Sequence, residues 1–218
     1  MTRKEKKTMF KMTLKAEDYN EILRLGKIVK PDRKNTHEEL DNIAIYIDDP
    51  LVEGEALFCD NYLYGKFVFQ IQEIIDTTGH AKPCVFMLPR QTSEAAKPGT
   101  YVSITWYEAD ETERHFTTEP VYAKIEGTSK FGNRIAPEFG VPVGYWPVRR
   151  LEKDFEKEPV EEDLSYNVER MQRFASFFPK NQNCRLRFRY QGIFGKVSIL
   201  NNEWYCYTLG CKLSKRRA

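Results

Sequence analysis

The sequence predicts an α+β protein dominated by β-structure, with an antiparallel meander sheet, a few helices and a small C-terminal unit of one helix and three strands. Three observations support this fold class. Short runs rich in aromatic and branched residues recur in the first half of the chain, separated by Gly, Pro and Asn. Amphipathic segments with helical spacing lie near each end. A run in which basic and apolar residues alternate lies close to the C-terminus.

Length and composition indicate a globular protein. The 218 residues are 41% hydrophobic and 13% aromatic, which suffices for a core in one large or two small domains. Charged residues make up 30% and the net charge is +2, which argues against a disordered chain or a uniform polycation. No apolar stretch is long enough for a membrane helix, and the basic start has no apolar signal segment behind it. We therefore expect a cytoplasmic protein without membrane contact.

The first predicted element is a short amphipathic helix over Leu14–Leu25. Tyr19, Ile22 and Leu23 share one side of it, Thr13 is its expected cap, and Gly26 is its expected end. A strand ending in residues 43–47 follows, because its branched residues run into the turn sequence Asp48-Asp49-Pro50.

Four further strands are predicted to form an antiparallel meander. In the longest, Phe67, Phe69 and Ile71 alternate with more polar residues, which is typical of a sheet with one buried face. The four predicted strands are Ala56–Asp60, Lys66–Ile75, Cys84–Leu88 and Tyr101–Glu108.

Part of this region resembles a known family. The segments Ala56-Leu57-Phe58-Cys59-Asp60, Phe67–Asp76 and Val85–Arg90, the last with a Met-x-Pro element before a basic residue, are similar to the septation regulator family SpoVG. The resemblance implies a β-sheet with a helix and binding of DNA or RNA, as in bacterial and mobile-element proteins. It covers at most residues 55–125. Residues 101–106 depart from the family's His-Pro element, so no binding residue is transferred.

The composition changes along the chain and predicts three regions. Residues 1–126 form a helix and β-sheet domain. Residues 127–162 form a connecting segment, first rich in Gly and Pro and then acidic, with seven acids between Glu152 and Asp163. Residues 163–218 form a helix followed by a basic β-meander and a basic tail. The helix is expected after Asp163 as cap, and its buried side is predicted from the spacing of Leu164, Val168, Met171, Phe174, Ala175 and Phe178.

The alternating run Arg185 to Tyr190 suggests a ligand class. In a strand its three arginines share one face at a spacing of about 7 Å. Residues 180–218 contain nine basic residues and one acid, Glu203, so they have a net charge of +8, and residues 1–179 one of −6. Such a row suits a polyanion, but an exposed edge strand that resists aggregation has the same pattern. Both interpretations stay open at this point.

The nucleic-acid hypothesis names its contacts. Phosphates would be neutralised by Arg185, Arg187, Arg189, Lys196, Lys212, Lys215, Arg216 and Arg217. Bases would stack on Tyr190, Phe194, Tyr205 and Tyr207, unless these rings belong to the core.

Motifs for catalysis are weak. Lys124-Ile125-Glu126-Gly127 resembles the nucleophilic lysine element of ATP-dependent ligases and capping nucleotidyltransferases, but no matching downstream elements follow. His115 lies in a charged segment that a hairpin turn explains better than a general base. The five cysteines and three histidines are scattered, so we expect reduced thiols, no metal and no cofactor.

Three functions follow in order. The first is a non-enzymatic DNA- or RNA-binding protein that uses the basic strand and tail, from a bacterial mobile element or phage. The alternative is a protein-interaction or inhibitor factor, such as a phage component, that docks a protein partner by charge complementarity. The third is a nuclease or nucleotidyltransferase whose residues are dispersed through the fold.

Overall fold

A computed structural model describes most of the chain. It covers residues 7–29, 38–47, 53–60, 63–76, 84–90, 94–109, 122–140, 164–165, 168–177, 184–189, 194–199, 204–209 and 211–212, with the backbone alone from 184 onward. The elements before residue 108 are β1 (Thr8–Lys15), α1 (Ala16–Ile28), the 3₁₀ helix η1 (Glu38–Asp41), β2 (Asn42–Ile47), β3 (Glu53–Cys59), β4 (Leu63–Asp76), β5 (Cys84–Pro89) and β6 (Tyr101–Tyr107). The later elements are β7 (Tyr122–Thr128), β8 (Arg134–Ile135), β9 (Glu138–Gly140), β10 (Leu164–Ser165), α3 (Val168–Ser176), β11 (Cys184–Arg189), β12 (Phe194–Ile199), β13 (Trp204–Leu209) and β14 (Cys211–Lys212).

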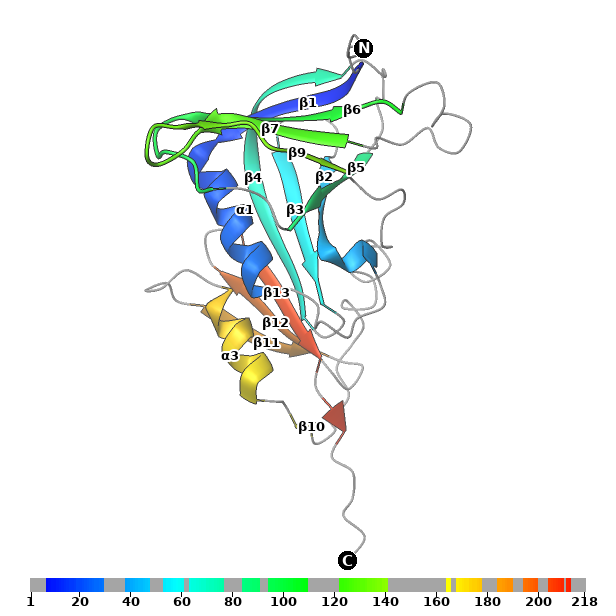
Figure 1. Cartoon of the computed structure of the whole chain (residues 1–218). Coiled ribbons are helices and arrows are strands. Elements are labelled where there is room, and N and C mark those ends of the chain that lie inside the picture. Colours follow the sequence, from blue (N-terminus) through cyan, green and yellow to red (C-terminus); the bar gives the residue numbers. More distant parts are fainter. Residues whose placement is uncertain are drawn as a thin grey trace, which may run out of the picture.

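The fold is β-dominated, with a curled antiparallel sheet and few helices, as the α+β prediction expects (Figure 1). One path through the sheet has the order β11-β12-β13-β4-β1-β6-β7-β8. A branch continues from β4 through β3 and β2 to β5. This order departs from a simple meander, because β1 lies between β4 and β6, and β5 pairs with β2.

Strand β4 joins the two branches of the sheet. Tyr64 pairs with Cys59 of β3 and also with Tyr207 of β13, so these strands lie on opposite edges of β4. Further along, Ile71–Asp76 pair with β1. The predicted alternation is confirmed, since Phe67, Phe69 and Ile71 are buried.

Three aromatic rings close the curl of the sheet. Phe86 of β5 stacks on Phe10 of β1 and on Trp106 of β6, with ring centroids 4.5 Å and 4.8 Å apart. The Trp106 indole Nε1 also donates to the Met87 carbonyl oxygen at 2.9 Å. The end of one branch of the sheet therefore packs against the other branch, and large apolar burial stabilises the contact.

Helix α1 packs on the core but its bounds differ from the prediction. Thr13 lies in β1, and the helix starts after Lys15, where no side chain caps it. The Ala16 amide instead donates to the Thr100 carbonyl oxygen at 2.9 Å. Gly26 does not end the helix. A Cβ there would lie 2.9 Å from Ile43 Cδ1, so glycine lets α1 approach β2 closely.

The C-terminal elements agree in part with the prediction. Helix α3 is shorter than expected, because Leu164 lies in β10 and Val168 is 72% exposed, whereas Phe174 and Phe177 are buried. The three strands β11–β13 form a meander, and β13 pairs with β4 of the larger sheet. The domain boundaries stay a prediction, and Asp163, Phe178 and residues 141–162 lie outside the described residues.

Residues 127–140 are regular, although their Gly and Pro content predicts an irregular segment. Thr128 pairs with Arg134 across the β7–β8 hairpin, and Lys124 pairs with Glu138 of β9. Glycine is used here for a turn, since Gly132 has φ of 85°.

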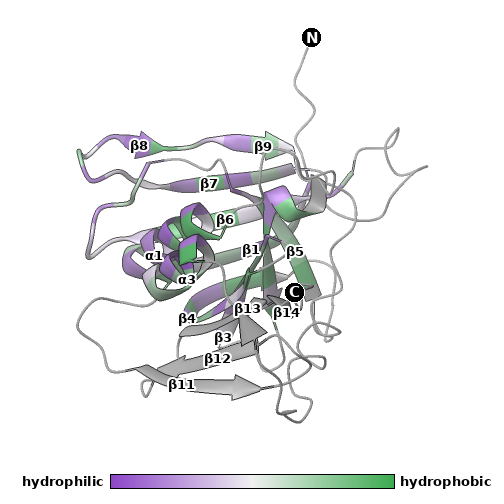
Figure 2. Ribbon diagram, turned by 90° about the horizontal axis from the view of Figure 1, so that it is seen from below, coloured by the Kyte–Doolittle hydropathy of each residue, from purple (hydrophilic) through white to green (hydrophobic). Residues whose placement is uncertain are grey.

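Helices α1 and α3 lie side by side on the sheet (Figure 2). Each contributes buried side chains to one continuous core, including Tyr19 and Ile22 from α1 and Phe174 from α3. Neither of these two described helices is long and apolar enough to span a membrane.

Gly65 of β4 provides a test of the packing of α3. A Cβ at Gly65 would lie 2.2 Å from Cε2 of Phe177, whose ring is fully buried and cannot swing away into solvent. We expect Gly65→Ala to lower the free energy of unfolding by about 1–3 kcal/mol in urea denaturation, as overpacking does. Gly140→Ala is the matched control, because a Cβ at Gly140 would meet nothing within 4 Å. Equal stabilities of the two variants would contradict this packing.

Candidate functional site

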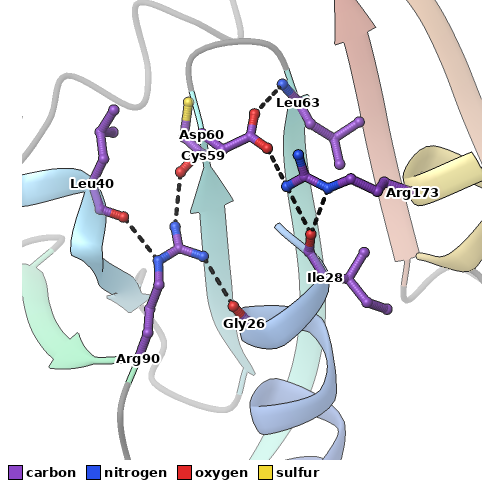
Figure 3. Close-up of polar contacts among 8 residues, drawn as sticks. All are labelled: Gly26, Ile28, Leu40, Cys59, Asp60, Leu63, Arg90 and Arg173. Atoms are coloured by element: carbon purple, nitrogen blue, oxygen red, sulfur yellow. Dashed lines mark hydrogen bonds and ion pairs between the residues drawn. The ribbon is translucent and has the colours of Figure 1, made fainter. Parts of the chain in front are cut away.

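A cluster of charged side chains lies at the C-terminal end of α1 (Figure 3). Asp60 follows β3, Arg90 follows β5, and Arg173 belongs to α3. Three segments distant in sequence therefore meet where the last carbonyl groups of a helix lack intrahelical donors.

Arg90 binds three backbone carbonyl groups. Its Nε donates to the Leu40 oxygen at 2.8 Å, its Nη2 to the Cys59 oxygen at 2.8 Å, and its Nη1 to the Gly26 oxygen at 3.3 Å. Burial lowers the pKa of Arg90 to about 10, so the guanidinium stays charged at neutral pH. One side chain thereby ties α1 to η1 and to the end of β3.

Arg173 binds α1 and a buried carboxylate. Its Nε and Nη2 donate to the Ile28 oxygen at 3.1 Å and 2.8 Å, and Nη2 also donates to Oδ2 of Asp60. Asp60 is only 3% exposed, and its Oδ1 accepts from the Leu63 amide at 2.7 Å. The charge of Asp60 is therefore compensated by an arginine and a backbone N–H, as a buried carboxylate requires.

The two helices cap each other. Arg24 of α1 donates through Nη1 to the Ser176 oxygen at 2.8 Å and through Nη2 to the Phe177 oxygen at 2.7 Å, at the end of α3. Arg173 of α3 meanwhile binds Ile28 at the end of α1. The partners run in opposite order, so the last turns of the helices are antiparallel. Each arginine also places a positive charge at the negative end of the other helix dipole.

This arginine cluster is best interpreted as structural. The hydrogen bonds drawn for Arg90 and Arg173 all end on protein oxygens (Figure 3). Its chemistry is the attachment of α1 and α3 to each other and to the ends of β3 and β5.

A second candidate site is the tip of the β7–β8 hairpin, residues 129–133. Phe131 at this tip is 71% exposed. The backbone around it is well ordered by hydrogen bonds, since the buried Ser129 accepts from Phe131 N and Asn133 N through its Oγ, both at 3.2 Å. The Ser129 amide also donates to the Asn133 oxygen at 2.7 Å. The tip thus holds an exposed aromatic ring on a defined turn.

Loop 94–100 supports this tip from α1. The Asn20 amide group donates to the Ala96 oxygen at 2.9 Å and accepts from the Ala96 N–H at 2.7 Å, as a strand neighbour would. Ala96 in turn forms an isolated antiparallel bridge with Ser129. Glu17 accepts from the Gly99 amide, and this bond lowers the pKa of Glu17.

The predicted basic row occupies a defined register. Arg187 pairs with Lys196, which pairs with Tyr207, which pairs with Tyr64 of β4. Gly65, the next residue of β4, has its Cβ direction toward Phe177 of α3. By strand alternation, the Arg187 register position therefore belongs to the sheet face opposite α3.

The other predicted nucleic-acid contacts are placed only in part. Lys212 pairs with Leu164, and Phe194 pairs with Arg189. Arg185 lines up through Ser198 with Tyr205. Tyr190, Lys215, Arg216 and Arg217 lie outside the described residues. A role for any of these residues stays a prediction.

The lysine of the ligase-like motif is in an unsuitable environment for a nucleophile. Lys124 Nζ lies 2.9 Å from Oε1 of Glu126, and this hydrogen bond raises the pKa of Lys124. A nucleophilic amine needs a lowered pKa instead. His115 lies outside the described residues, and among the described ones no group of three His, Cys, Asp or Glu could hold a metal ion.

Sequence reasoning did not identify Asp60, Arg90, Arg173 or Arg24. Arg173 stands beside the apolar positions of its helix, which is the only local signal it gives. Asp60 ends a predicted strand like many turn residues, and its partner is 113 residues away. Neither the pairing nor the reciprocal caps have a sequence motif.

No family model matches the sequence, and no curated protein resembles it. Solved structures of similar fold include the DNA polymerase III β subunit of Thermotoga maritima, at 10% identity and TM-score 0.56, over 92% of this chain and 64% of that one. The Helicobacter pylori β clamp bound to a DNA ligase peptide has 9% identity and TM-score 0.55, over 97% and 68%. The Pseudomonas aeruginosa sliding clamp bound to griselimycin has 9% identity and TM-score 0.51, over 95% and 66%.

These comparisons establish a fold similar to that of sliding clamps. The chain spans about two thirds of the length of the clamps. They also overturn the first functional prediction, a nucleic-acid-binding protein built on the basic strand and tail, and favour the alternative, a protein-interaction factor. The error arose because an arginine row is equally compatible with an exposed strand of a scaffold. The resemblance to the SpoVG family stays a prediction.

Removing Arg173 tests the cluster. Arg173→Met leaves the carboxylate of Asp60 buried without its guanidinium, and we expect a loss of about 3 kcal/mol in the free energy of unfolding. Arg134→Met is the control, because Arg134 is 74% exposed in its ion pair with Glu126 and should cost less than about 1 kcal/mol. Asp60→Asn combined with Arg173→Met should recover part of the loss. A harmless Arg173→Met would contradict the assignment.

Proposed function

We propose that the chain is a protein-interaction scaffold of the sliding-clamp type, which holds partner proteins at DNA. The observation that supports this most is the similarity of nearly the whole chain to several solved clamps, at TM-scores between 0.51 and 0.56. One of these clamps was solved with a DNA ligase peptide bound, which is the kind of partner contact a scaffold makes.

The proposal differs from phosphate binding by a basic row. A sliding protein must stay on DNA without fixed contacts, and enclosure achieves this without strong attraction. Phosphate contacts instead give a binding constant that falls steeply with salt. A compact chain of 218 residues has a radius of gyration of about 17 Å, too small to surround a duplex alone. The scaffold would therefore use more than one copy.

A threading experiment tests the proposal. A duplex is fixed to a bead by one end, the protein is added, and the free end is then blocked by streptavidin on a terminal biotin. The control blocks the end before the protein is added. We expect retention through a high-salt wash only when the block comes second, and release when a restriction enzyme cuts the duplex.

The opposite results are equally clear. Equal retention in both orders would indicate binding to the duplex surface, and loss of the protein in both orders would argue against enclosure. Light scattering after size exclusion gives the copy number in the same preparation, and a strict monomer of 25.7 kDa would also contradict the proposal.

A further inference from the structure

The hairpin tip has a feature that the fold does not need. Phe131 is 71% exposed although the chain buries most of its described aromatic rings. The ring adds no core contact, because the turn is held by Ser129 and by Gly132 at φ of 85°. A large apolar side chain left in solvent on an ordered turn is typical of a contact site.

The tip is also pre-organised. Its backbone bonds to loop 94–100 through Lys130 N to the Ala95 oxygen at 3.1 Å and Lys97 N to the Thr128 oxygen at 2.8 Å. Asn20 fixes the same loop to α1. A partner would therefore meet a ring that needs little further ordering, which reduces the entropy cost of binding.

The charge around the ring selects the partner. Lys130 Nζ lies 4.9 Å from the centroid of the Phe131 ring, and Lys97 and Arg134 are exposed nearby along the same loop and hairpin. Glu94 is the exposed acid of this loop, and Glu126 is already shared by Lys124 and Arg134. The surroundings of Phe131 are thus net positive.

From the exposed ring, the fixed turn and the positive surroundings, we infer that the 129–133 tip binds an extended acidic segment of a partner protein. An apolar side chain of that segment would cover Phe131, while its carboxylates would meet Lys97, Lys130 and Arg134. Aromatic anchors of this kind dominate binding, and the flanking charges mainly set specificity and association rate. The inference concerns protein binding at one surface and does not require enclosure of DNA.

Panning tests this inference with a defined probe. Short random peptides displayed on phage are selected on the immobilised full-length protein, and the enriched peptides are synthesised for affinity measurement. We expect sequences that combine Asp or Glu with apolar residues. Their affinity should fall about tenfold or more with Phe131→Ala. It should weaken with Lys130→Glu and at higher salt, and it should survive in Phe131→Tyr, which keeps the ring.

Val168→Ala is the matched control, because Val168 is 72% exposed on α3, away from the tip, and its removal should leave peptide affinity unchanged. Thermal melts should confirm that each variant is folded. The inference is overturned if no acidic and apolar sequences are enriched, or if those enriched bind Phe131→Ala as tightly as the unmodified protein. Tip-dependent binding of DNA or of a second copy, in place of peptide, would overturn it too. None of these results affects the threading experiment.

Discussion

The fold depends on how the open C-terminal ends of its two described helices are satisfied. Arg24 of α1 binds the last carbonyls of α3, and Arg173 of α3 binds the last carbonyl of α1. Without a donor these buried or half-buried oxygens would cost free energy, and each arginine also meets the negative end of a helix dipole. Because Arg173 binds Asp60 as well, the same contact fixes the end of β3 and the start of β4.

From this constraint follows the relation between the two halves of the chain. Helix α3 is held on the face of β4 where Gly65 leaves room for the Phe177 ring, and β13 pairs with the edge of the same strand. The later elements thus extend the sheet of the earlier ones. The register places the Arg187 position on the opposite face, which agrees better with an outer strand of a scaffold than with a groove beneath the helices.

The sequence predicted what is local and missed what is distant. The alternation in β4 correctly indicated a strand with a buried face, and the run from Arg185 was correctly expected to be a strand. Strand β1 was missed because Lys11 and Lys15 interrupt its apolar residues, and the ends of α1 were set by Thr100 and Ile43 rather than by local caps. The ligand inferred from the arginine row failed, because charge spacing alone does not distinguish a binding face from a solvated one.

The reciprocal caps are tested most directly by a double-mutant cycle of Arg24→Met and Arg173→Met, with the free energy of unfolding measured for all four proteins. Both arginines hold the same pair of helices, so loss of one should release the other. We predict that the double variant loses less than the sum of the single variants, with a coupling of about 1 kcal/mol or more. Strict additivity would contradict the account, because it would mean that the two caps act independently.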